Sequence, residues 1–231
     1  MSTAAPADPA AIPALSDASA EARTTLVAHA ARYHAAGWLM GTAGNLSMAI
    51  PQPDGTRRIV VTASGRDKGA LGLDDFVEVS PSGALLGAGP DARPSAETSI
   101  HLAVYAERPT ARAVFHVHTV ASTLLGLGRP LPWDEPFEGL EMLKGWGLWQ
   151  PGAAARLRVF ENHHHVPQIA DDMVRWLRET PALAAQGAVP ACLIAGHGLT
   201  AWGDSAFEAH RHVEITEFLC RLAQDRARRQ V

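Results

Sequence analysis

Two histidines one residue apart follow a short apolar run, Ala113 to Phe115, that is typical of a buried β-strand. Because successive strand side chains point to opposite faces, His116 and His118 share a face, with their Cα atoms roughly 6–7 Å apart. Two imidazoles at that separation can bind one metal ion through bonds of about 2.0–2.1 Å. An ordinary pair of histidines at a strand end is the alternative. We favour a metal site, with the rest of the chain as its scaffold.

A third histidine follows another apolar segment. Residues 191–195 are wholly apolar, which predicts a buried strand, and they lead into Gly196-His197-Gly198. Flanking glycines let the backbone turn sharply and let a ligand approach closely. We therefore expect His197 to supply the third imidazole. Three histidines with an open fourth position are typical of a catalytic rather than a structural zinc site.

Composition limits the partners and the compartment. The chain has 231 residues, of which 47% are hydrophobic and 19% charged, and this suits a protein with a sizeable core. Its formal charge of −4 gives no reason to expect nucleic acid or an acidic membrane surface as a partner. No apolar run approaches the roughly 20 residues of a membrane span. The two cysteines, Cys192 and Cys220, are too few for a disulfide framework and fit a reducing compartment such as the cytoplasm.

Periodicity, capping residues and turn residues predict the order of helices and strands. Helices are expected over 16–36, 94–106, 120–127, 166–177 and 205–226, and further strands over 46–50, 58–63, 76–79, 84–86 and 157–160. The Ala/Pro-rich residues 1–15 are expected to be disordered, and residues 16–231 to form a single domain. The tryptophan-rich segment 130–151 is expected to be irregular and functional.

Two turns carry short polar side chains that suit an anion. One precedes the strand expected at 46–50 and the other follows the strand expected at 58–63. Backbone N–H groups exposed in such turns bind phosphate, although each turn could equally be an ordinary loop or hairpin end. If the two strand ends are adjacent, the turns could together hold one phosphate. The candidate residues are Asn45, Ser47, Ser64, Gly65 and Lys68.

Other polar residues have simpler explanations. Ser95 is a good N-cap for the helix expected at 94–106, and Glu97 would lie in its first turn, where an anion suits the helix dipole. His101, further along that helix, is expected to be a packed histidine. The triplet at 163–165 has neighbouring side chains that point in different directions, so we expect a solvated loop or a subunit contact there rather than metal ligation.

Five short motifs follow one another along the chain. They are Gly44-Asn45-Leu46-Ser47, Thr62-Ala63-Ser64-Gly65, Pro94-Ser95-Ala96-Glu97, His116-Val117-His118-Thr119 and Gly196-His197-Gly198. In this order they resemble the successive signatures of the class II aldolase/adducin-head family, over about residues 26–222. The resemblance implies an α/β fold with three α/β/α layers and a mainly antiparallel central sheet. It also implies one Zn²⁺ per subunit, held by His116, His118 and His197, and a homotetramer with sites near subunit contacts.

Three segments narrow the resemblance to one branch of that family. They are Ser64-Gly65-Arg66-Asp67-Lys68-Gly69, Glu141-Met142-Leu143-Lys144-Gly145 and His197-Gly198-Leu199-Thr200-Ala201-Trp202-Gly203. This branch removes water from 5-methylthioribulose 1-phosphate, giving 2,3-diketo-5-methylthiopentyl 1-phosphate in methionine salvage. The likeness implies that Glu141 is the catalytic acid/base. It also implies that the phosphate lies on the two polar turns, and that Ser95 and Glu97 lie by the substrate.

Two alternatives follow from the same resemblance. In the aldolases of the family, a glutamate at the position of Glu97 transfers the proton, and this chain has carboxylates at both 97 and 141. The first alternative is therefore cleavage of a sugar phosphate such as fuculose 1-phosphate, with Glu97 as the acid/base. The second is a non-catalytic interaction module like the adducin heads, which keep the fold without the metal. The presence of all three histidines argues against the module.

Overall fold

A computed structural model describes residues 16–87, 92–127 and 129–229 of the chain. The tail over 1–15, which the sequence predicts to be disordered, lies outside these residues. Within them, no helix is long and apolar enough to cross a membrane.

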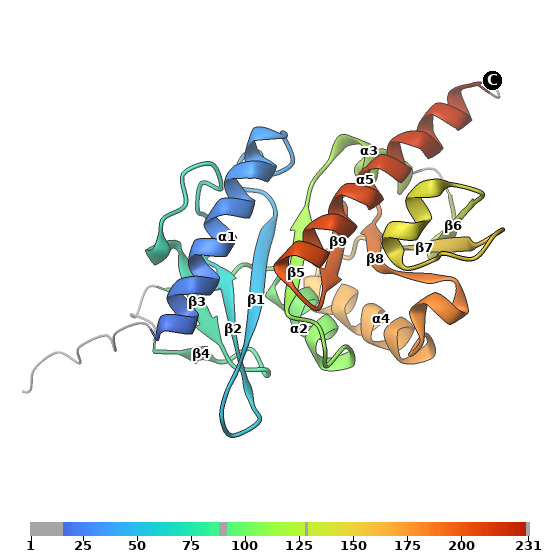
Figure 1. Ribbon diagram of the computed structural model, residues 1–231. Helices are drawn as coiled ribbons and strands as arrows, with labels where there is room; N and C mark the ends of the chain where they lie inside the picture. Colours follow the sequence, from blue (N-terminus) through green and yellow to red (C-terminus); the bar gives the residue numbers. More distant parts are fainter. Residues whose placement is uncertain (1–15, 88–91, 128, 230–231) are drawn as a thin grey trace, which may run out of the picture.

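One mixed sheet forms the centre of the structure (Figure 1). Its strand order in the described residues is β4-β3-β2-β1-β5-β9-β8-β7-β6, and neighbours are antiparallel except for β7 and β8. This confirms the mainly antiparallel sheet. The strands are β1 (Asn45–Pro51), β2 (Arg57–Thr62), β3 (Phe76–Val79), β4 (Leu85–Leu86), β5 (Ala113–Val117), β6 (Trp133–Glu138), β7 (Ala154–Phe160), β8 (Ala188–Ile194) and β9 (Gly198–Gly203).

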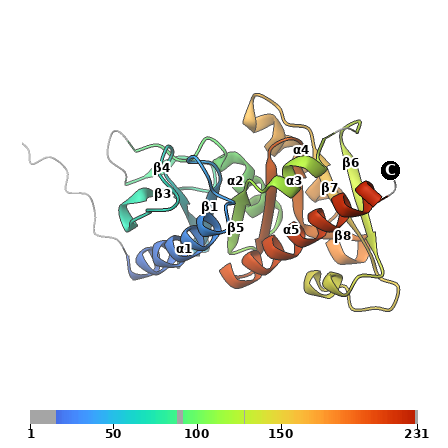
Figure 2. The same ribbon diagram turned by 90° about the horizontal axis from the view of Figure 1, so that it is seen from above.

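Helices cover both faces of this sheet and complete the predicted α/β/α layers (Figures 1 and 2). The helices α1 (Asp17–Ala35) and α5 (Ala206–Arg229) lie on one face, and α2 (Thr98–Glu107) and α4 (Val166–Glu179) on the other. The short α3 (Val120–Leu125) follows β5 and packs on α5. All five residues of β5 are buried, as expected for a central strand with both faces covered.

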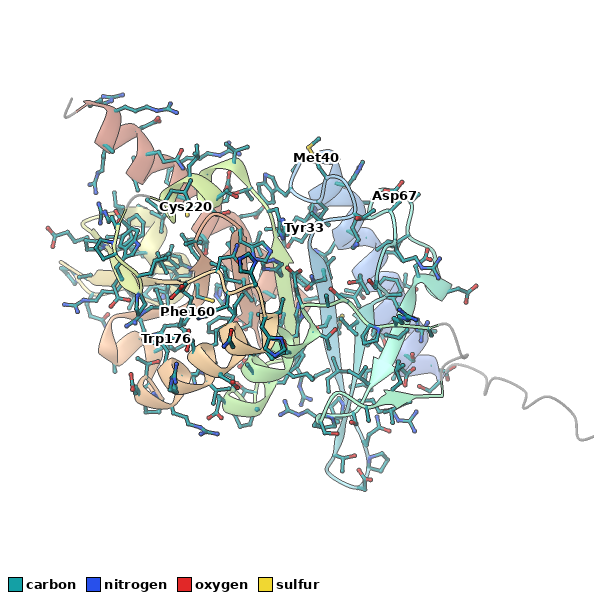
Figure 3. The ribbon with its side chains drawn as sticks, turned by 180° about the vertical axis from the view of Figure 1, so that it is seen from behind. Tyr33, Met40, Asp67, Phe160, Trp176 and Cys220 are labelled. Atoms are coloured by element: carbon teal, nitrogen blue, oxygen red, sulfur yellow. The ribbon has the colours of Figure 1, made fainter. Side chains whose placement is uncertain are left out.

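Alternate residues of each strand feed separate cores on the two faces. Phe115 of β5 belongs to the core under α1 and α5, whereas its neighbour Val114 belongs to the core under α2 and α4. In the second core, Phe160 and Trp176 lie side by side, with ring centroids 5.7 Å apart (Figure 3). The alternation of side chains along a strand therefore decides to which face of the sheet each residue at a strand end points, and so which of them can form a site together.

Capping residues begin the first and last helices where the sequence predicts. The Ser16 hydroxyl accepts a hydrogen bond from the Ser19 N–H, and Gly37 with φ +76° follows the end of α1. At α5, the Glu208 N–H donates to the Ser205 hydroxyl at 3.1 Å. The Glu208 carboxylate in turn accepts from the Asp204 N–H at 3.1 Å.

Two predicted elements are wrong in detail. The helix expected at 94–106 begins only at Thr98, because the backbone before it is extended and pairs with the end of β2 through the bridge of Ala63 to Pro94. Ser95 is therefore not its N-cap. The segment 130–151 is not wholly irregular, since all of β6 pairs with β7 and the 3₁₀-helix η2 (Glu141–Trp146) follows it. The Pro136 in β6 is tolerated because this strand lies at the sheet edge.

We predict that Gly126→Ala destabilises the protein. A Cβ at Gly126, just after α3, would lie 2.7 Å from the Ala195 Cα and 3.2 Å from the Gly196 N, which belong to the turn before His197. Such overpacking costs about 1–3 kcal/mol in unfolding free energy, measurable by urea denaturation. The control is Gly72→Ala, where a Cβ meets nothing closer than 3.8 Å. Equal stability of the two variants would contradict the packing described here.

Candidate metal centre

Four side chains converge where β5 leads into α3. The donor atoms of Glu97, His116, His118 and His197 all lie within 4.8 Å of one another. His116 is the fourth residue of β5, and the strand alternation carries His118 to the same side just beyond the strand end. His197 lies in the turn between β8 and β9, and Glu97 lies at the N-cap of α2. The cluster thus brings together three segments that are far apart in the sequence: the end of β5, the turn between β8 and β9, and the start of α2.

The spacing of the donor atoms fits a tetrahedral ion. The Nε2 atom of His116 lies 2.9 Å from that of His118 and 3.4 Å from that of His197. Two ligands at about 2.0–2.1 Å from one tetrahedral zinc ion are about 3.3 Å apart. The carboxylate of Glu97 closes the cluster, with one oxygen 2.7 Å from the His197 Nε2. Three imidazoles and a carboxylate are donors suited to zinc and to other divalent transition metals.

The ring of His116 is oriented by β9. Its Nδ1 lies 2.9 Å from the hydroxyl oxygen of Thr200, the residue opposite it in the ladder between β5 and β9. An Nδ1–H that donates to Thr200 leaves the lone pair on Nε2, which faces the cluster. Such a partner for the second ring nitrogen is the usual way in which a ligating histidine is held in the correct tautomer.

Burial and neighbouring charges set the protonation states. Burial, followed by the nearby His197, lowers the pKa of His118 to about 4, and burial lowers the pKa of His116 well below its usual value. Burial would raise the pKa of Glu97, but its interactions with His116 and His197 outweigh this and hold that pKa far below its usual value. At neutral pH, His116 and His118 are neutral and Glu97 is ionised, as metal ligation requires.

Behind Glu97, a chain of buried polar groups fixes the carboxylate. The Asn45 amide donates a hydrogen bond to Glu97 and accepts one from the His101 Nε2. The His101 Nδ1 lies 2.7 Å from the Ser47 hydroxyl, which lies 2.9 Å from the Tyr105 hydroxyl. Burial lowers the pKa of His101 to about 4, so this ring is neutral and can donate at one nitrogen and accept at the other.

The comparisons with known proteins agree with this geometry. The family described as Class II Aldolase and Adducin N-terminal domain matches residues 24–224. The chain belongs to this family.

Two curated relatives carry the same enzyme name. A methylthioribulose-1-phosphate dehydratase of Leptospira biflexa is 41% identical over 196 residues, covering 82% of this chain and 90% of the relative. Another from Microcystis aeruginosa is 39% identical over 201 residues, covering 86% and 93%.

Solved structures of the class II aldolase family share the fold. The L-fuculose-1-phosphate aldolase of Thermus thermophilus superposes with a TM-score of 0.66 at 22% identity, covering 92% of this chain and 98% of the aldolase. At that identity the likeness concerns the fold alone. It agrees with the α/β/α layers and the mainly antiparallel sheet.

The polar turn after β2 lies beside this metal cluster. Lys68 is almost fully buried, and its ammonium donates to the Thr42 carbonyl at 2.8 Å and to the Arg66 carbonyl at 2.9 Å. Its charge interacts with both Glu97 and His118. The Ser64–Gly65 turn is exposed, with Gly65 at φ +72°. The Ser64 N–H donates to the Arg93 carbonyl and the Ser95 N–H to the Thr62 carbonyl, so the turns containing Ser64 and Ser95 are adjacent.

Two of the predicted phosphate ligands do not fit a direct contact. Ser47 is fully buried and its hydroxyl faces His101 and Tyr105, away from the surface. The amide of Asn45 is 1% exposed and both of its polar atoms are engaged by Glu97 and His101. In the structure, both side chains belong to the hydrogen-bonded chain that reaches Glu97. The alternation along β1 places Asn45 and Ser47 on the same face of the sheet, toward α2.

Glu141 lies apart from the cluster within one chain. Its side chain is 82% exposed on η2, where the carboxylate pairs with Lys144 at 2.8 Å. In Figures 1 and 2, this part of the chain, drawn in yellow, lies beyond α5 as seen from β5. The carboxylate in direct contact with the histidines is Glu97.

Sequence reasoning missed the supporting groups Thr200, His101 and Tyr105. No motif spacing identifies Thr200, because its contact depends on the register that places it opposite His116. The backbone of Thr42 also marks this region, because its φ of +67° is unusual for a β-branched residue. Its carbonyl accepts from Lys68, so the unusual backbone lies where the turn meets the cluster.

We predict that His118→Ala abolishes metal binding, because two imidazoles rarely retain a catalytic zinc ion. The measurement is the metal content of the purified protein by mass spectrometry, with circular dichroism to check the fold. The control is His164→Ala, which removes an exposed histidine of the 163–165 triplet and should leave the metal content unchanged. Full metal content in the His118 variant would exclude this residue as a ligand.

Proposed function

We propose that this chain is a zinc-dependent cytoplasmic dehydratase that converts 5-methylthioribulose 1-phosphate to 2,3-diketo-5-methylthiopentyl 1-phosphate in methionine salvage. The observation that carries the proposal is a complete cluster of three histidines and one glutamate. It occurs in a chain that is 41% identical to a relative named for this reaction, over 82% of this chain and 90% of the relative. The cluster argues against a non-catalytic module.

The reaction removes the C3 proton and the C4 hydroxyl of the ketose. A zinc ion held by His116, His118 and His197 would act as a Lewis acid that makes the C3 proton acidic. A base takes that proton, an acid protonates the C4 hydroxyl as it leaves as water, and the resulting enol rearranges to the 2,3-diketone. Glu97 lies in direct contact with the histidines, with one carboxylate oxygen 2.7 Å from the His197 Nε2, so it would serve as a ligand or orienting group.

The turn after β2 would receive the phosphate. The Ser64–Gly65 turn is exposed and the buried Lys68 supplies a positive charge beside it. The burial of Lys68 lowers its pKa, and the charges of Glu97 and Asp67 oppose that change. A phosphate dianion bound there would stabilise the protonated lysine further. Ser95, on the adjacent turn, could add a hydroxyl to the same site.

Glu141 would act from a neighbouring subunit of a homotetramer. Its carboxylate is exposed on η2 and is not among the clustered donor groups, so a second copy is the simplest way to bring it to the reacting sugar. Exposed apolar side chains occur in both regions that would then meet. Val120 and Met40 flank the metal end at 76% and 67% exposure, with Met40 at the surface in Figure 3, and Trp149 near η2 is 66% exposed.

The assay that tests the reaction is incubation with 5-methylthioribulose 1-phosphate. We expect the absorbance of a diketone to appear, and to be lost after the metal is removed by a chelator. The aldolase alternative is favoured by the position of Glu97 within the cluster, and it would instead release an aldehyde fragment from fuculose 1-phosphate. Aldehyde release without diketone formation would contradict the dehydratase.

For the acid/base, we predict that Glu141→Gln keeps the metal and the fold but lowers kcat by about 10²- to 10⁴-fold. The control is Glu138→Gln, a nearby exposed carboxylate in β6. Full activity of the Glu141 variant, together with an inactive Glu97→Gln variant, would reverse the assignment.

Mixing two inactive variants tests whether Glu141 acts across subunits. In tetramers assembled from equal amounts of Glu141→Gln and His118→Ala chains, about a quarter of the sites combine an intact metal site with an intact glutamate of the neighbour. We therefore predict recovery of about a quarter of wild-type activity after joint refolding. No recovery in mixed tetramers would place both residues in the same subunit's site.

A further inference from the structure

The short helix α3 contacts the segments that carry two of the proposed metal ligands. Its N-cap, Thr119, directly follows His118 in the chain. One turn later, the Thr123 hydroxyl donates to the carbonyl of His197 at 2.9 Å. At its end, Gly126 packs against Ala195 and Gly196 just before that histidine. The distance between His118 and His197 therefore depends on where α3 sits.

A buried carboxylate of α5 holds the beginning of α3. Glu217 is 4% exposed, and its Oε2 accepts a hydrogen bond from the Thr119 hydroxyl. Its Oε1 accepts from the Arg221 Nε at 2.7 Å. One turn after Arg221, the Gln224 amide donates to the Ala121 carbonyl. Glu217 and Gln224 of α5 thus both form hydrogen bonds with the N-cap or first turn of α3.

The hydroxyl of Thr119 takes part both in the contact with Glu217 and in the N-cap hydrogen bond of α3. It donates to the Glu217 carboxylate and also lies 2.8 Å from the Ser122 hydroxyl. The oxygen then accepts the Ser122 N–H at 3.0 Å, which is the N-cap bond of α3. A buried carboxylate is unfavourable unless it is paired, and here both of its oxygens are used. An apolar side chain could fill this position equally well, so packing does not explain why a glutamate is present. The hydrogen bond by which Glu217 orients Thr119 does explain it.

From these contacts we infer that Glu217 is a positioning residue of the metal centre. It acts through Thr119 and α3 to set the separation of His118 from His197. The inference rests on the proposed metal site and not on the identity of the substrate. Groups that orient metal ligands from behind typically contribute 10- to 100-fold in metal affinity.

The test measures zinc affinity of the metal-free full-length protein by competition with a chromophoric chelator. Glu217→Leu should weaken zinc binding by about 10- to 100-fold. Glu217→Gln keeps an oxygen that can accept from Thr119, so it should lose less than about tenfold. The control is Glu214→Gln on the same helix, an exposed carboxylate paired with His210, which should bind zinc like the wild type.

A second pair of variants covers the case in which Glu217→Leu does not fold. Thr119→Val removes the hydroxyl and should weaken zinc binding, whereas Thr119→Ser keeps it and should restore binding. The visible spectrum of the cobalt-loaded protein provides a further readout, since it reports ligand geometry and would change in the Leu and Val variants only.

The outcomes separate this inference from the proposed function. If folded Glu217→Leu or Thr119→Val binds zinc with wild-type affinity and an unchanged cobalt spectrum, the positioning role is wrong, even if the variant is less stable in urea. If the wild type itself binds no zinc, the metal site fails and this inference fails with it. Zinc binding as expected, without dehydratase activity, would contradict only the substrate assignment.

Discussion

The convergence of three imidazole nitrogens and one carboxylate is the constraint on which the rest of the structure depends. These donor atoms lie within 4.8 Å of one another, and burial keeps His116 and His118 neutral. Bringing such groups out of water is unfavourable unless their lone pairs find a partner. A divalent ion bound between them would satisfy all four at once. The surrounding fold can be understood as the means of holding these groups together.

The sheet supplies most of that rigidity. The ladder of β5 with β9 places Thr200 behind His116, and the ladder of β5 with β1 places Asn45 beside it, facing Glu97. The remaining groups of the cluster lie beyond strand ends or on turns, and turns are in general more mobile than strands. Here the turns are tied to helices: α3 contacts both segments that carry His118 and His197. Strand register and helix packing together therefore fix a site that neither would fix alone.

Much of this could be predicted from the sequence, and the limits have physical causes. Local patterns identified the strand that contains His116 and ends just before His118, and the turn that bears His197, whereas the layers of the fold followed from the resemblance to the family. The polar character of Asn45 and Ser47 predicts an anion site, but their contacts with Glu97 and His101 depend on the pairing of β1 with distant strands. Thr200 and Glu217 were missed for the same reason, since their partners lie 84 and 98 residues away in the chain.

The most direct test of the central claim is anomalous diffraction from crystals of the zinc-loaded protein, with data collected on both sides of the zinc absorption edge. We expect one strong peak per chain, lying about 2.0–2.1 Å from the Nε2 atoms of His116, His118 and His197. A structure with these histidines intact and no peak between them, or with the ring of His197 turned away from the other two, would contradict the account.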